Sequence, residues 1–379
     1  MSEMRTILKD PESSNSQRSV WTIPKGLKIN ARKIRVCNFQ ISNSNGDQIY
    51  FNHSGVYSLL NKVAIYSLNG TEIDKLSNME IMALKLAHAE NASQFAVNRQ
   101  LSQNMCNSIY VNNLGQADLT EQSQRDDGSL MQVYIDVSFV LSYLQRRTVI
   151  DEGMTVLLEW ADPSVVGFQY SFIVPPCLAI DEYLTDVPSD PFDTLPYLTI
   201  IQDKLIVPVG QNGFEKRLNA FYNQYIANVY FLNVLNPTEN PLVNAVAPSG
   251  EQLEITIDGR KVIMLKGINT PGKKLGYLQD FSGGFVTVPG YDSTLALTSG
   301  WAGFHNPNTN LDYANNFSYG CFLLNRYINM DFTVSYNFAT PVPATSPSGW
   351  TLLILAEVLR SYDRVNDKVS FVSSPVVPT

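Results

Sequence analysis

Two stretches of this sequence alternate apolar and polar side chains, and this pattern favours an extended strand over any other backbone conformation. Residues 131–140 place an apolar side chain at every second position, and residues 332–338 repeat the pattern. Because successive side chains of a strand point to opposite faces, such alternation predicts strands with one buried face. The dipeptides Asn69-Gly70 and Asp258-Gly259 follow or separate further apolar runs and are typical of hairpin turns.

The composition agrees with a chain built mainly of strands. It holds 19 Tyr, 18 Phe, 22 Gly and 20 Pro, and 44% apolar against 16% charged residues excludes a disordered chain or a charged coiled coil. No strand-helix-strand alternation of a parallel sheet occurs, so an all-β chain is predicted. Further strands are expected over 33–41, 56–68, 154–160, 168–174, 204–209, 221–235, 253–257, 262–265 and 350–358.

One segment has helical spacing, and it predicts a single notable helix over 74–91. Ser77 and Glu80 have the spacing of a capping box, within a start that Asp74 would cap. A short helical turn is also expected over 141–146. The apolar side chains that recur every three to four residues in the longer segment are Ile73, Leu76, Met79, Ala83 and Leu86.

The length of 379 residues predicts two domains or one elaborated large one, since a domain has roughly 150 residues. The acidic, proline-rich stretch 186–203 is expected to be the junction between a first, basal domain (25–185) and a second β-domain (204–379). Both halves share an order of short strands, long loops and a closing apolar strand, which is typical of jelly-roll sandwiches. Whether the second domain is appended, or inserted so that 350–360 returns to the first, stays open.

Charge is distributed unevenly along the chain. Residues 1–36 carry eight basic and three acidic groups, a local charge of +5, whereas the whole chain carries −8. Residues 1–24 are therefore expected to form a mobile basic arm. Such an end fits phosphate or a membrane surface, although a short exposed tail is often basic for solubility alone. The residues expected to make such contacts are Lys25, Lys28, Arg32, Lys33 and Arg35.

Cysteine and histidine are scattered, which argues against a zinc site. No C-x-x-C pair or Cys/His cluster is present, so we expect neither a bound metal nor a cofactor. The N-terminal residues lack the apolar region of a signal peptide, and no run reaches the ~18 apolar residues of a membrane span. Four free thiols in a reducing compartment are therefore expected, at Cys37, Cys106, Cys177 and Cys321.

No motif predicts catalysis. Gly267–Lys274 matches a phosphate-binding loop except that a lysine replaces the required hydroxyl and no helix follows. Adjacent carboxylates such as Asp151-Glu152 cannot converge on one glycosidic bond from a strand. A calcium site at Asp186, Asp190 and Asp193 is less favoured than a solvated linker, because EF-hand spacing is absent. We therefore expect no catalytic residues, with a β-sandwich lectin or glycoside hydrolase as the remote alternative.

Three segments carry a family resemblance: LKINARKIRVCNFQI (27–41), GVYSLLNKVAIYSLNGTEIDKLSNMEIMALKLAHAEN (55–91) and VYIDVSFVLSYLQRRTVIDEGMTVLLEWAD (133–162). They resemble the jelly-roll of the penton, or minor capsid, proteins of virophages and related double-stranded DNA viruses. The resemblance implies a structural protein of the virion, assembled in the host cytoplasm, with five copies at each vertex of an icosahedral shell. Its implied partners are other copies of itself and neighbouring trimers of a major capsid protein.

The resemblance also implies contacts on both sides of such a shell. The basic arm would point inward, toward DNA, a membrane or a neighbouring subunit, and an outer domain could meet a host receptor or glycan. Residues 320–338 and 349–371 resemble instead the end of a double jelly-roll major capsid protein, so a trimeric major capsid protein is the alternative. Against it, 379 residues leave little room for the long loops of such a protein.

Overall fold

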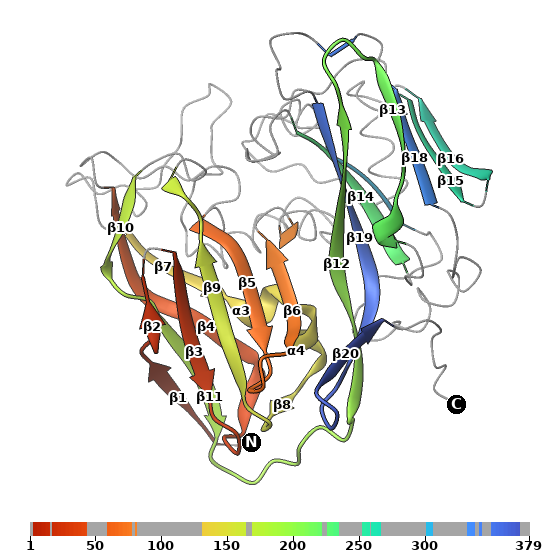
Figure 1. Ribbon diagram of the computed structural model, residues 1–379. Coiled ribbons are helices and arrows are strands. Elements are labelled where there is room, and N and C mark those ends of the chain that lie inside the picture. The colour runs from red at the N-terminus through yellow and green to blue at the C-terminus, as the bar shows by residue number, and fades with distance from the viewer. Residues whose placement is uncertain are drawn as a thin grey trace. The chain divides into compact units, whose positions relative to one another are not determined.

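Antiparallel strands make up both units into which the chain divides (Figure 1). In this computed structural model, unit 1 comprises Met1–Met82, Val97–Thr199 and Arg360–Ser370, and unit 2 comprises Ala83–Ala96, Ile200–Leu359 and Phe371–Thr379. The structure describes residues 3–15, 17–43, 59–77, 80–81, 131–163, 169–221, 226–234, 252–257, 259–266, 301–305, 332–337, 341–342 and 350–371.

Most of the described strands of unit 1 form two sheets. The first has the order β1 (Met4–Lys9), β11 (Cys177–Tyr183), β4 (Ile29–Asn43) and β10 (Tyr170–Val174), and β4 also pairs with β7 (Met131–Asp136) and β8 (Val149–Ile150). The second has the order β2 (Ser13–Ser14), β3 (Arg18–Ile23), β9 (Met154–Trp160), β5 (Leu60–Tyr66) and β6 (Glu72–Ser77). The predicted strand over 154–160 is confirmed as β9, and those over 33–41 and 168–174 lie largely within β4 and β10.

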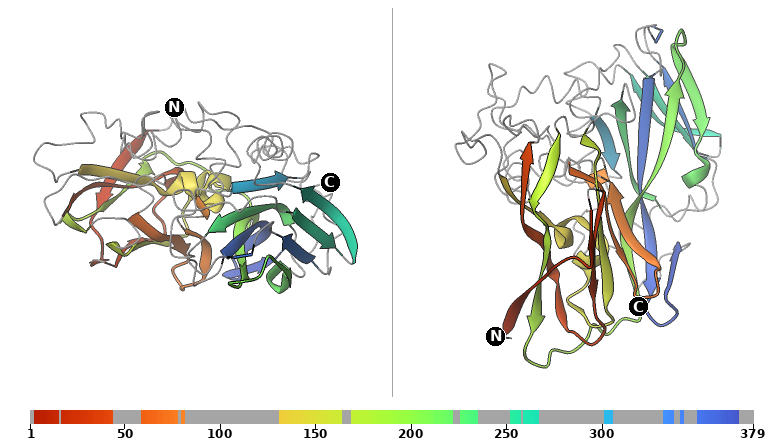
Figure 2. Two further views of the ribbon diagram at one scale, coloured as in Figure 1. Left: turned by 90° about the horizontal axis from the view of Figure 1, so that it is seen from above. Right: turned by 60° about the vertical axis from the view of Figure 1, so that its left-hand side comes forward.

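An apolar core lies between the two sheets of unit 1, which Figure 2 shows as two layers. Strand β9 buries every second side chain from Met154 to Trp160, as its alternation requires. Strand β4 contributes Ile34 and Val36 from the other sheet, and both are fully buried. The sheets meet directly where the rings of Trp160 and Phe172 lie 4.8 Å apart. Each fully buried aliphatic side chain contributes about 1.5–3 kcal/mol to the stability of this core.

The described residues among 1–24 do not form the mobile arm that the sequence predicts, since β1 and β3 lie there. Strand β1 pairs with β11 along its whole length, and β3 pairs with β9 while burying Trp21 and Ile23. Arg5 of β1 adds an ion pair to Glu182, 2.5 Å away. The side chains of β1 are mostly exposed because the strand lies at a sheet edge, which explains why its composition is that of a tail. Backbone hydrogen bonds to β11 fix it in place.

The alternating run over 131–140 is a strand only in its first part. Strand β7 ends at Asp136, and helix α3 (Val137–Val140) follows it. The buried Ser138 hydroxyl accepts a hydrogen bond from the Ile34 N–H of β4, 2.7 Å away, in place of the carbonyl that a continuing strand would offer. The helical turn expected over 141–146 is confirmed as α4 (Ser142–Arg146).

A hairpin replaces the start of the helix predicted over 74–91. Strand β6 pairs with β5 through a turn at Asn69-Gly70, where Gly70 has a φ of +92°. Such a positive φ favours glycine, so the turn signal of the sequence is confirmed. The prediction of a helix from residue 74 is wrong, because Asp74 lies within β6 and caps no helix.

The capping box expected within that helix is confirmed. The Glu80 carboxylate accepts a hydrogen bond from the Ser77 N–H at 2.6 Å, and the Ser77 hydroxyl accepts one from the Glu80 N–H at 3.4 Å. These reciprocal bonds satisfy amide groups that a helix start leaves unpaired. Residues 80–81 are helical, and the remaining residues of the prediction, 82–91, lie outside the described residues.

Two further sheets hold the strands of the second half of the chain. One has the order β12 (Thr194–Val207), β19 (Trp350–Asp363), β14 (Ile226–Val234) and β17 (Trp301–His305), with β20 (Lys368–Phe371) paired to β19. The other has the order β13 (Gly213–Arg217), β18 (Phe332–Asn337), β15 (Gln252–Ile257) and β16 (Arg260–Lys266). The predicted hairpin is confirmed as β15 and β16, with Gly259 at a φ of +71°. Within the described part of the chain, no helix is long and apolar enough to span a membrane.

The acidic stretch 186–203 is not a linker throughout. Its second half lies in β12, which buries Leu195 and Tyr197 on either side of an exposed Pro196. Proline is tolerated there because β12 lies at the edge of its sheet. The division between the two units falls inside β12, after Thr199, and again inside β19. The assignment of a basal and an outer domain stays a prediction.

Candidate functional site: a polar network and the predicted basic contacts

The basic residues predicted to contact a partner do not form one free patch. Lys25 and Arg32 are exposed. Lys28 donates to the Asp186 carboxylate at 2.5 Å and to the Val187 carbonyl at 2.7 Å. Its charge therefore ties the loop after β11 back to unit 1. Exposed pairs of this kind contribute less than about 1 kcal/mol to stability.

Lys33 and Arg35 share one acidic partner on the neighbouring strand. Each lies 3.6 Å from the carboxylate of Asp181, which is buried in β11. The Thr6 hydroxyl of β1 donates to the same carboxylate at 2.7 Å. One carboxylate thus joins three strands of the first sheet and offsets part of the basic charge of β4. A partner for these basic residues stays a prediction.

The three loop carboxylates considered for calcium do not converge on one point. Each has a basic partner of its own, and none of the groups of His, Cys, Asp or Glu in the described residues could hold a metal ion. The pairs are Asp186 with Lys28, Asp190 with Arg147 and Asp193 with Arg364. Asp186 and Asp193 remain largely exposed, as the solvated linker of the prediction would be, and only Asp190 is held in a largely buried ion pair.

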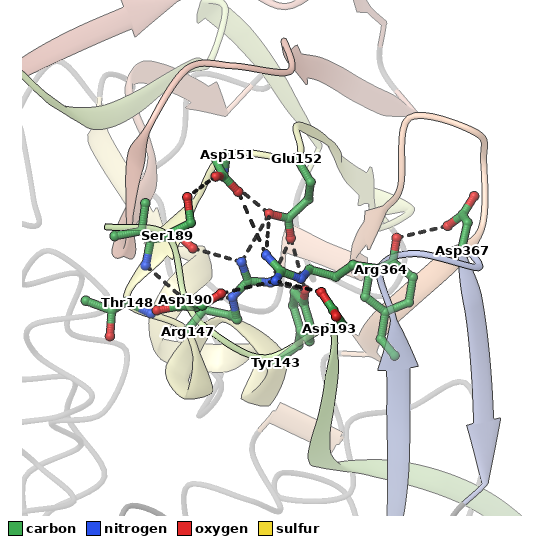
Figure 3. A network of polar contacts seen from close by, with 12 residues as sticks. Tyr143, Arg147, Thr148, Asp151, Glu152, Ser189, Asp190, Asp193, Arg364 and Asp367 are labelled. Carbon is green, nitrogen blue, oxygen red and sulfur yellow. Dashed lines mark hydrogen bonds and ion pairs between the residues drawn. The ribbon is translucent and has the colours of Figure 1, made fainter. Parts of the chain in front are cut away.

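Arg147, which follows α4, is the centre of the polar network in Figure 3. Its side chain is 1% exposed. Its Nε donates to Asp190 at 2.6 Å, Nη1 donates to the Tyr143 hydroxyl and to Glu152, and Nη2 donates to the Val149 carbonyl and to Glu152. All five N–H groups of the guanidinium are therefore used. The buried charge is compensated by two carboxylates, and Glu152 is bound by both terminal nitrogens of the guanidinium.

Arg364, just after β19, extends the network. Its guanidinium lies 3.9 Å from the Asp151 carboxylate, 3.8 Å from Glu152 and 3.6 Å from Asp193. It also donates to the backbone carbonyl of Asp190 at 3.1 Å. Residues of unit 1 that are as far apart in the sequence as Tyr143 and Arg364, 221 positions, thus meet in one cluster, which Figure 3 shows converging on the two arginines.

Two members of the network, Asp151 and Arg147, are stabilised in their charged forms. Burial opposes ionisation of Asp151, but the Ser189 hydroxyl and the arginines outweigh it and lower the pKa of this carboxyl. Burial likewise opposes the charge of Arg147, and Tyr143 and Glu152 outweigh it and raise the pKa of the guanidinium. A glycosidase needs one carboxyl that stays protonated near neutral pH. Asp151 is instead stabilised in its ionised form, so the contacts of this carboxylate are those of a structural clamp.

A second buried carboxyl was not found from the sequence. Asp74 of β6 accepts hydrogen bonds from the Tyr143 N–H at 3.1 Å, the Thr199 hydroxyl at 2.9 Å and the Lys75 N–H at 3.0 Å. Burial raises its pKa to about 7 despite these donors. Asp74 therefore joins β6, α4 and β12 within unit 1. Its only sequence signal was a polar residue directly after the apolar Ile73, which also fits a helix cap.

One motif weighed in the sequence, the phosphate-loop-like Gly267–Lys274, lies outside the described residues.

Comparison with known proteins identifies the fold. A scan of protein-family models and a search of the curated proteins find no match. Among solved structures, the chain is similar to VP54 of PBCV-1, fitted into a reconstruction of the virophage Sputnik, with a TM-score of 0.57 and 11% identity over 98% of this chain and 97% of that one. It is also similar to a chain of the Sputnik virophage structure, with a TM-score of 0.57 and 11% identity over 97% and 88% of the two chains.

The major capsid protein of mavirus gives a TM-score of 0.53 and 13% identity over 99% of this chain and 93% of the other. The chain therefore has the jelly-roll fold of viral capsid proteins, with a second jelly-roll-like unit, as the sequence predicted. The resemblance to penton proteins is not shown in particular, because major capsid proteins are named among these neighbours. The length objection is wrong, since the mavirus protein is matched over nearly its whole chain.

Proposed function

We propose that this chain is the major capsid protein of an icosahedral virus, and that it assembles as a trimer in which each copy supplies two jelly rolls. The observation that carries the proposal is the extent of the match. Both units are covered together in an alignment over 99% of this chain and 93% of the mavirus major capsid protein. A penton with one basal jelly roll and an unrelated outer domain would be expected to match over its basal part only.

The polar contacts of unit 1 support a structural role. The carboxylates of the network are neutralised by Arg147 and Arg364, and the loop that follows β11 is tied down at both ends. A rigid unit loses little conformational freedom when it joins a shell, so more of the buried interface area contributes to assembly. Closed symmetry then lets one interface repeat until the oligomer is complete.

The mass of the purified oligomer tests the proposal. The chain has a mass of 42.3 kDa, so a trimer has about 127 kDa and a pentamer about 212 kDa. Native mass spectrometry of the full chain at several protein concentrations is expected to give the trimer. A pentamer would instead support the penton hypothesis, and a monomer at every concentration would contradict both capsid roles.

A further inference from the structure

Two cysteines that are 140 positions apart in the sequence lie opposite each other in the first sheet of unit 1. Cys37 of β4 is the direct pairing partner of Cys177 of β11. Both are free thiols. Directly opposed residues of antiparallel strands have Cα atoms about 4.5–5.5 Å apart. A disulfide needs Cα atoms about 4.4–6.8 Å apart, so the strand pairing already supplies the required separation.

The two side chains also lie on the same face of the sheet. Val36 and Leu178 are fully buried on the core side, and alternation places their neighbours Cys37 and Cys177 on the opposite side. The ion pair between Arg35 and Asp181 agrees with this arrangement. Arg35 lies two positions from Cys37 on β4, and Asp181 lies four positions from Cys177 on β11, so the even spacing places these side chains on the same face as the cysteines. The Cys37 side chain is partly exposed and Cys177 is buried, so a small reagent reaches the pair through Cys37.

The thiols influence each other. Burial is the main cause that raises the pKa of the Cys37 thiol to about 11, and the neighbouring Cys177 thiol raises it further. The reactive thiolate is therefore rare at neutral pH, and the pair remains reduced until an oxidant acts on it for long enough.

We propose that Cys37 and Cys177 form a reversible disulfide when the protein meets an oxidising medium, and that this bond fastens β4 to β11. With oxidised glutathione as the oxidant, the Cys37 thiolate attacks one glutathione sulfur and releases a glutathione thiolate. The Cys177 thiolate then attacks the mixed disulfide and releases the second glutathione. Two protein thiols lose two electrons and two protons, and one glutathione disulfide becomes two glutathione thiols. The bond would close a loop of 140 residues, and a loop of this length strongly reduces the conformational entropy of the unfolded chain.

The test uses the full chain, incubated with oxidised glutathione at pH 8 and digested without reduction. Mass spectrometry is expected to find one linked peptide pair, containing Cys37 and Cys177, that dithiothreitol separates. Calorimetry is expected to give a melting temperature at least about 5 °C higher for the oxidised protein. The rate of bond formation is expected to rise about tenfold per pH unit from pH 7 to 9, since the pKa of Cys37 lies near 11.

Two variants control for the other cysteines. Cys177→Ser is expected to abolish both the linked peptide and the thermal shift, and the double variant C106S/C321S is expected to keep both. The proposal would be overturned if Cys37 carried glutathione adducts without any Cys37–Cys177 linked peptide, or if the linked peptides joined other cysteines. The outcome does not depend on the oligomeric state, so the capsid proposal and this one can fail separately.

Discussion

Replacing Arg147 by glutamine tests whether the polar network stabilises unit 1. The substitution removes a guanidinium whose carboxylate partners, Glu152 and Asp190, are only 20% and 15% exposed. Removing one member of a buried ion pair costs about 3–5 kcal/mol, because the remaining charge stays poorly solvated. We expect the free energy of unfolding of unit 1 to fall by about this amount in Arg147→Gln. Arg147→Lys keeps the charge but loses the planar guanidinium. Its free energy of unfolding is expected to lie between those of the unsubstituted protein and of Arg147→Gln.

Urea denaturation followed by tryptophan fluorescence measures the effect. With a slope of about 2–3 kcal/mol per M, the loss corresponds to a midpoint about 1–2.5 M lower. The matched control is Arg32→Gln, since Arg32 is an exposed arginine of the same unit, and its effect is expected to stay within about 0.5 kcal/mol. An Arg147→Gln midpoint that matches the control would refute the conclusion that the network stabilises the unit.

Three further substitutions probe local features of unit 1. Folding raises the pKa of Asp74 from 3.8 to about 7, so the folded state binds the extra proton and stability falls as the pH rises from about 4 to 7; Asp74→Asn is expected to flatten this part of a melting-temperature profile, and an unchanged slope would contradict the assignment. Ser77→Ala removes half of the capping box and is expected to cost about 0.5–2 kcal/mol in urea denaturation, whereas no loss would show that the cap is dispensable. Gly153 has a φ of +77°, and an added Cβ would lie 2.8 Å from the Ile23 carbonyl oxygen, whereas Gly70 has a similar φ and open space around it. Gly153→Ala is therefore expected to lower the free energy of unfolding more than Gly70→Ala. Equal losses of stability would show that the backbone strain at positive φ, and not the close contact, determines the effect.

Local signals predicted the strands well where one face is buried and the other exposed. Alternation found β18, and the Asp258-Gly259 turn found the β15–β16 hairpin. The same signal failed at α3. There the Ser138 hydroxyl accepts the hydrogen bond from the Ile34 N–H of β4 in place of a backbone carbonyl, and the sequence of residues 137–140 does not indicate this contact. It also failed at β1, whose exposed side chains carry no apolar pattern.

The site could be predicted far less well than the fold. Arg147, Asp190 and Arg364 are separated by 43 and then 174 positions, and only the pairing of the sheets and the course of the loop after β11 bring them together. The Cys37–Cys177 pair likewise depends on the register of β4 and β11, which alternation does not specify. The predicted basic contacts followed from charge alone, and charge does not reveal that Asp181 and Asp186 already bind three of them.

A map of the purified oligomer by electron cryomicroscopy tests the central claim most directly. If each chain contributes two jelly rolls to a trimer, six upright sandwiches surround a threefold axis and give the particle a nearly hexagonal outline. A fivefold ring, with one sandwich per chain beside a domain of a different fold, would contradict the account.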